Sequence, residues 1–119
     1  MTNSRHATEM QAMIDAVLTS SGETDPTLRQ AVAARASELG GYSTDMHADI
    51  PSELAPYITK VALHAYKVTD EDIEALRKNG YSEDAIFEIT LSAALGAGLA
   101  RLKSGLAVLG GNHSANQQA

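Results

Sequence analysis

The feature that most constrains the fold is the segment from Glu83 to Leu109, which is apolar on two opposite faces when it is written as a helix. One stripe consists of leucines at helical spacing, namely Leu91, Leu95, Leu99, Leu102, Leu106 and Leu109. The other consists mostly of small residues, namely Ile86, Ile89, Ala93, Gly96, Ala97 and Ala100. A helix that is apolar nearly all round is buried on both sides, and a chain of 119 residues has little protein with which to do this. We therefore predict self-association through residues 83–109, with the small residues allowing close backbone approach.

Four shorter helices are expected before this segment. Apolar periodicity and end signals place them at about residues 5–19, 26–39, 52–67 and 69–80. Asp25 before Pro26 is typical of a helix start, and Thr69 with Asp72 resembles a capping box. Residues 41–51 lack periodicity and are expected to form a loop. The prediction is one all-α domain over residues 1–109, with about five helices in antiparallel pairs, followed by a polar and disordered tail over residues 110–119.

Composition excludes several classes of function. The sequence has no cysteine, so disulfides, thiolate nucleophiles, Cys-ligated zinc and iron–sulfur clusters are excluded. The net charge of the chain is −6. The 9 Lys and Arg residues form no cluster, which argues against binding to nucleic acid or anionic lipid. The N-terminal sequence lacks the apolar core of a signal peptide, and Arg101 and Lys103 interrupt the most apolar later stretch. We expect a cytoplasmic protein that does not span a membrane.

The C-terminal half carries a resemblance to a known family. The residues that carry it are Val68 to Leu102, with the sequence VTDEDIEALRKNGYSEDAIFEITLSAALGAGLARL, roughly a third of the chain. A short helix ends in a Leu-Arg-x-x-Gly-like phrase at Leu76–Gly80, and Ser-Glu-Asp-x-Ile-x-Glu then opens a long helix rich in small residues. This run resembles the AhpD-like superfamily, which includes alkylhydroperoxidase AhpD proteins and carboxymuconolactone decarboxylases. The resemblance implies an all-helical domain that assembles into dimers, trimers or hexamers.

The chemistry that the resemblance implies is only partly transferable. Redox members of the family reduce peroxides with a Cys-x-x-Cys pair, and this sequence has no cysteine. The peroxidase activity is therefore excluded. The decarboxylase branch needs no cysteine, although its basic and histidine residues have no clear matches here. A cofactor-independent acid/base enzyme acting on a small carboxylate or lactone stays open as an alternative to a non-redox binding or structural module.

The candidate catalytic residues for that alternative are His64, Glu88 and Tyr66. A general acid/base pair requires an imidazole within hydrogen-bond reach of a carboxylate that orients it. The competing interpretation makes His64 a hydrogen-bonded helix residue and Glu88 a solvated or cap-pairing one. No cofactor and no metal are expected, and a small acidic ligand is the partner considered besides a second copy of the chain.

Three other patterns have structural explanations that we favour. Asp45, His47 and Asp49 alternate in the expected loop, but no second cluster completes a metal site. The Gly96–Gly98 segment lies within a helix instead of after a strand, which favours close packing over phosphate binding. The Gly110–Gly111 pair resembles the cleavage site of a double-glycine leader, so a carrier of a C-terminal peptide cleaved after Gly111 is a further alternative; a glycine helix stop is the simpler explanation.

Overall fold

The chain folds into helices alone over the residues that the structure describes. The computed structural model describes the backbone of residues 2–42 and 49–118, and the side chains of residues 5–42 and 49–110. The elements are α1 (Thr2–Thr19), α2 (Pro26–Leu39), α3 (Ala55–His64), the 3-10 turn η1 (Ala65–Lys67), α4 (Asp70–Lys78) and α5 (Glu83–Gln118). No strand occurs in these ranges, so the prediction of an all-α fold is confirmed.

Local sequence signals set most of the helix ends. The Asp25 side chain accepts a hydrogen bond from the backbone N–H of Thr27 at the start of α2. At the start of α4, Thr69 and Asp72 form the expected capping box. Gly41 and Gly80 follow α2 and α4 with φ values of 95° and 97°, a conformation that glycine adopts at little cost.

Two helix ends differ from the predicted ones. α3 ends at His64 and continues only as the short turn η1 to Lys67. α5 runs past the expected end at Leu109 and continues to Gln118. Gly110 was expected to stop it, but only Gly41 and Gly80 have positive φ among the described glycines. A glycine that keeps helical dihedrals lowers helix stability without ending the helix.

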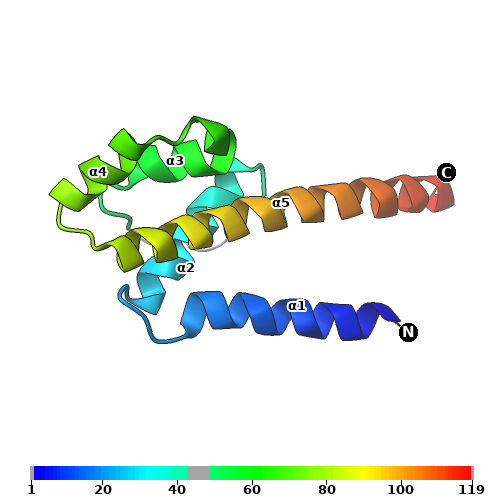
Figure 1. The fold of residues 1–119 in the computed structure, drawn as a ribbon. Helices are drawn as coiled ribbons and strands as arrows, with labels where there is room; N and C mark the ends of the chain where they lie inside the picture. The colour runs from blue at the N-terminus through cyan, green and yellow to red at the C-terminus, as the bar shows by residue number, and fades with distance from the viewer. Residues whose placement is uncertain (1, 43–48, 119) are drawn as a thin grey trace.

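α5 is the central element and the other helices pack around it (Figure 1). α2 crosses it, α3 and α4 lie on one side, and α1 lies on the other and runs antiparallel to α5 (Figure 1). The core consists of Val32, Ala36, Leu54, Tyr57, Ile58, Val61, Ala62, Leu76, Ile86, Ile89, Ala93 and Ala97. The small-residue stripe of α5 therefore faces this core, and the leucine stripe faces away from it.

The crossing of α2 and α5 depends on Gly96. A Cβ atom added at Gly96 would lie 2.1 Å from the carbonyl oxygen of Ala33, which no real side chain tolerates. Gly98 has open space where its Cβ would be. The prediction that this glycine segment serves close helix packing is confirmed at Gly96, and the close approach is between two helices of the same chain.

Candidate functional site

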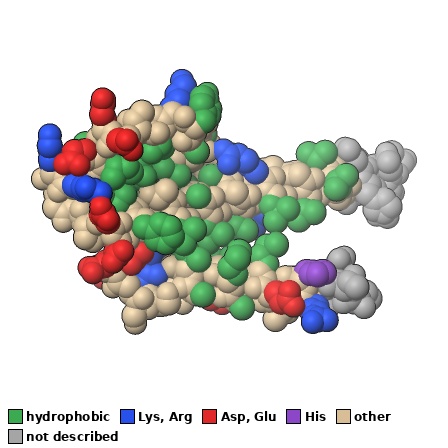
Figure 2. Space-filling model, viewed as in Figure 1, with side chains coloured by type: hydrophobic (Ala, Val, Ile, Leu, Met, Phe, Trp, Pro, Cys, Tyr) green, Lys and Arg blue, Asp and Glu red, His purple; other side chains and the backbone are tan. Residues whose placement is uncertain are grey.

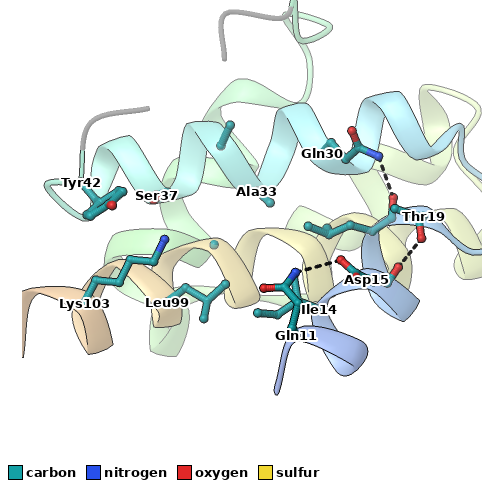
Figure 3. Close-up of a pocket in the computed structure, with 13 residues that line it drawn as sticks. Gln11, Ile14, Asp15, Thr19, Gln30, Ala33, Ser37, Tyr42, Leu99 and Lys103 are labelled. Carbon is teal, nitrogen blue, oxygen red and sulfur yellow. Dashed lines mark hydrogen bonds between the residues drawn. The ribbon is translucent and has the colours of Figure 1, made fainter. Parts of the chain in front are cut away.

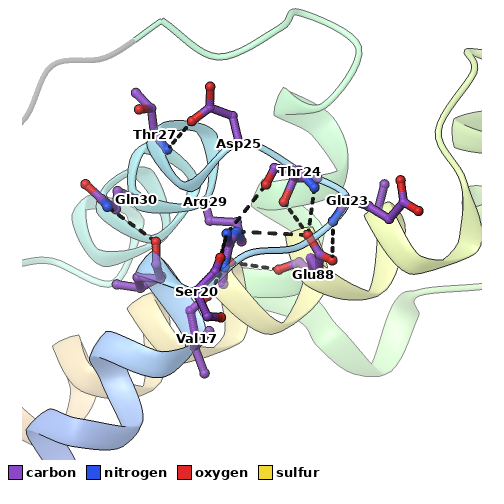
Figure 4. Close-up of polar contacts among 12 residues, drawn as sticks. Val17, Ser20, Glu23, Thr24, Asp25, Thr27, Arg29, Gln30 and Glu88 are labelled. Atoms are coloured by element: carbon purple, nitrogen blue, oxygen red, sulfur yellow. Dashed lines mark hydrogen bonds and ion pairs between the residues drawn. The ribbon is translucent and has the colours of Figure 1, made fainter.

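The carboxylate of Glu88 binds the loop between α1 and α2 (Figure 4). Its Oε2 accepts a hydrogen bond of 2.9 Å from the backbone N–H of Glu23. Its Oε1 accepts one of 2.9 Å from the N–H of Thr24 and one of 2.5 Å from the Thr24 hydroxyl. Gly22 leaves the room for this, because a Cβ there would lie 2.6 Å from Oε2. Glu88 thus fixes the path of the chain from α1 into α2.

Arg29 of α2 completes this arrangement from beneath the loop. The residue is only 2% exposed, and its guanidinium donates to the carbonyl oxygens of Val17, at 2.5 Å, and of Ser20. Its Nε lies 4.0 Å from Oε1 of Glu88 and has no hydrogen-bond partner among the described residues. These contacts, which we call the Arg29–Glu88 cluster, join the end of α1, the start of α2 and the first half of α5.

The surroundings of Glu88 favour its ionised form. Partial burial raises the pKa of this carboxyl, but the hydrogen bonds from Thr24 and Glu23 together with the charge of Arg29 outweigh burial and lower the pKa below its ordinary value. A carboxylate whose oxygens are occupied in this way is a weak base. The cluster therefore has the properties of a structural joint, which matches the cap-pairing interpretation of Glu88.

Protonation of Glu88 is expected to destabilise the fold. Because its pKa is lower in the folded chain than in the unfolded chain, its stabilisation is present above the unfolded value and is lost as the pH falls through the folded value. Glu88→Gln is expected to be less stable than wild type at pH 7 and to lose less stability between pH 7 and pH 3. Urea unfolding at both pH values measures this, with Glu38→Gln, at an exposed position of α2, as the control. A Glu88→Gln curve parallel to wild type would contradict the prediction.

The other two candidate catalytic residues lie elsewhere. His64 ends α3, is exposed, and meets the ring of Tyr66 edge-on with a centroid separation of 6.2 Å. Tyr66 is 82% exposed. The guanidinium of Arg101 donates to the carbonyl oxygen of Ala62 near the end of α3, and Arg101 lies about 20 Å along α5 from Glu88. The structure therefore does not bring His64 and Glu88 together within the chain.

The structure shows no metal site in the described part of the predicted loop, residues 41–42 and 49–51. Asp45 and His47 lie outside the described residues, and Asp49 is exposed. Among the residues that are described, no group of three His, Asp or Glu side chains is placed to hold a metal ion.

Exposed large apolar side chains are concentrated on α1 and α5. Eight of the eleven exposed large apolar side chains of the described residues lie on these two helices. They are Met10, Met13, Phe87, Leu91, Leu102, Leu106, Val108 and Leu109. Hydrophobic side chains gather along the seam between α1 and α5 and continue onto the part of α5 that projects from the body (Figure 2). Patches of this kind mark interaction sites.

α5 also has the length and the apolar composition of a membrane-spanning helix. Residues Glu83–Gly110 are long and apolar enough to cross a membrane by length and composition, with a mean hydropathy of 1.4 in the most apolar window. The core helix of a soluble protein has the same length and composition, and 44% of that window is buried inside this chain.

Comparison with known proteins gives no relative from which a site could be transferred: no family model, no curated protein and no solved structure matches the chain. The resemblance to the AhpD-like superfamily stays a prediction. Sequence reasoning named Glu88 but missed Arg29 and Thr24, which occupy its oxygens. Arg29 lies beside Ala33 and Ala36 on the predicted helix, and a charged residue next to small apolar ones is the signal that could have indicated a buried partner.

Proposed function

We propose that the chain is a non-redox, homo-oligomeric helical module whose copies pair through the apolar surface of α1 and α5. The basic unit is a dimer in which the α1–α5 pair of one copy packs on the same pair of a second copy. The observation that carries the proposal is the exposure of Leu102, Leu106 and Leu109, at 42%, 57% and 71%, along one face of the projecting part of α5. The AhpD-like scaffold is part of this proposal as a resemblance only.

The shape of the protomer supports a helical partner. The molecule measures 56 × 26 × 25 Å, and the projecting part of α5 and the N-terminal half of α1 diverge away from the body (Figure 1). Their apolar side chains leave a notch between the two helices (Figure 2). A second α1–α5 pair has the same length and the same apolar faces, which is the self-complementarity that a two-fold interface requires. Two such pairs make a four-helix bundle.

The charges beside these faces also favour a second copy. Arg101 and Lys103 flank Leu102 on α5, and no acidic residue follows them between positions 104 and 110. α1 carries Glu9 and Asp15 beside its apolar face. An α1 helix from a second copy therefore brings carboxylates toward Arg101 of α5. Such rim charges set orientation more than affinity.

The mass of the protein in solution tests the proposal. Light scattering coupled to gel filtration is expected to give twice the 12.5 kDa chain mass at about 100 μM. Leu106→Glu is expected to weaken the dimer by at least about 100-fold, because two buried leucines are lost from each interface. The matched control is Leu63→Glu, at a similarly exposed leucine of α3 (41%); this variant is expected to stay dimeric. Circular dichroism checks that both variants fold.

Two results would overturn the proposal. One is a wild-type chain that stays monomeric at this concentration. The other is wild-type protein that sediments with phosphatidylcholine vesicles and forms no dimer in their absence, because the leucine face would then be a lipid-contacting surface.

A further inference from the structure

A pocket of about 450 Å³ lies where α1, α2 and α5 meet (Figure 3). This volume is in the range of small-molecule sites in proteins. Its floor and walls are apolar and come from Ile14, Leu18, Ala33, Ala34, Gly96 and Leu99. Gly96, where α2 and α5 cross closely, contributes to the lining of this pocket.

The two ends of the pocket carry different polar groups (Figure 3). At one end Lys103 lies over the ring of Tyr42, with Nζ 4.5 Å from the ring centroid. At the other end Asp15 accepts a hydrogen bond of 2.9 Å from the side-chain amide of Gln11. Gln30 donates to the carbonyl oxygen of Leu18 and closes this end.

At the cationic end, the ammonium group of Lys103 has donors that are available to a ligand. Lys103 forms no ion pair with any carboxylate among the residues that the structure describes, and its one recorded contact is the Tyr42 ring. An ammonium group has three donors, and a ring face satisfies none of them as a carboxylate does. The carboxylate of Asp15, by contrast, already has a donor.

We propose that this pocket binds an amphipathic carboxylate, with its apolar chain over Gly96 and Leu99 and its carboxylate group on Lys103. Gly96 and Lys103 lie about 10 Å apart along α5, which suits a medium-length aliphatic chain. Ala34 of α2 and Leu99 of α5 line the groove on either side of the chain. The residues that line this site do not include the proposed dimer contacts at Leu102, Leu106 and Leu109.

The test is a titration of the full chain with sodium octanoate, followed by ¹⁵N–¹H NMR. We expect saturable shifts of the Gly96, Leu99 and Lys103 amide signals, with a dissociation constant of about 1 mM or tighter. Octylammonium, which has the same chain and the opposite charge, is expected to bind at least about fivefold more weakly. The Leu106→Glu variant is expected to bind octanoate as wild type does. Octanoate binding can therefore be tested separately from dimerisation.

Three variants assign the site. Lys103→Met is expected to weaken octanoate binding by roughly fivefold to tenfold, because a charge-assisted contact is lost. Lys78→Met, at an exposed lysine of α4, is the matched control and is expected to bind like wild type. Ala34→Phe fills the pocket without changing its charge and is expected to abolish saturable shifts. Thermal unfolding verifies that each variant folds.

The proposal is overturned if octanoate shifts signals outside this pocket only, or shifts none. It is also overturned if octylammonium binds as tightly as octanoate, or if Lys103→Met and Lys78→Met bind equally well.

Discussion

Gly96→Ala is expected to lower the free energy of unfolding by about 2 to 3 kcal/mol. Alanine favours a helix more than glycine does, so the intrinsic effect of this change is stabilising. Packing reverses the sign, because the new Cβ would lie 2.1 Å from the carbonyl oxygen of Ala33. That oxygen belongs to backbone, so α2 and α5 must separate along their whole contact. Urea unfolding followed by circular dichroism measures the change.

Gly98→Ala is the matched control for this substitution. Gly98 lies two positions along the same helix and has open space where its Cβ would be. The same chemical change is therefore expected to raise the free energy of unfolding by about 0.5 to 1 kcal/mol. Equal effects of the two substitutions would show that helix propensity, and not the crossing at Ala33, decides the stability of this region.

Arg29→Met is expected to destabilise the chain by about 3 to 4 kcal/mol. Methionine has a similar length and keeps the apolar contacts of the arginine stem. It removes the donors for the carbonyl oxygens of Val17 and Ser20 and the positive charge beside Glu88. The lost partners are inside the protein, so water does not replace them fully.

Arg35→Met on the same helix is the control for Arg29→Met. Arg35 is exposed, and its replacement is expected to change the free energy of unfolding by less than about 0.5 kcal/mol. Chemical denaturation of both variants at pH 7 gives the comparison. If Arg29→Met loses less than about 1 kcal/mol, the Arg29–Glu88 cluster does not hold the three helices together.

The helix ends that are set by residues close together in the sequence were predicted from the sequence. The cap at Asp25, the capping box of Thr69 and Asp72, and the turn at Gly80 each involve residues a few positions apart, so a single pass along the chain finds them. The small-residue stripe also predicted close packing, and Gly96 provides it. The same reasoning failed at Gly110, because the identity of a glycine does not determine its backbone conformation.

The polar sites depend on contacts between distant parts of the chain. Thr24 and Glu88 are 64 positions apart, and nothing in the spacing of either residue indicates the other. The alternative that paired Glu88 with His64 rested on residue type alone, because the sequence does not establish the distance between them. In the structure, the hydrogen bond from Arg101 to the carbonyl oxygen of Ala62 holds the end of α3 near Arg101, far along α5 from Glu88. The pocket beside Lys103 likewise takes residues from three helices, and only the crossing of those helices brings them together.

Three hydrogen bonds that join α1 and the loop after it to α2 lie at the C-terminal end of α1. Arg29 and Gln30 bind the carbonyl oxygens of Val17, Leu18 and Ser20, while Met10 and Met13 are partly in water. The Arg29–Glu88 cluster therefore fixes the C-terminal end of α1 and the loop after it to α2 and α5. Loss of this cluster is expected to loosen α1 before the crossing of α2 and α5 opens.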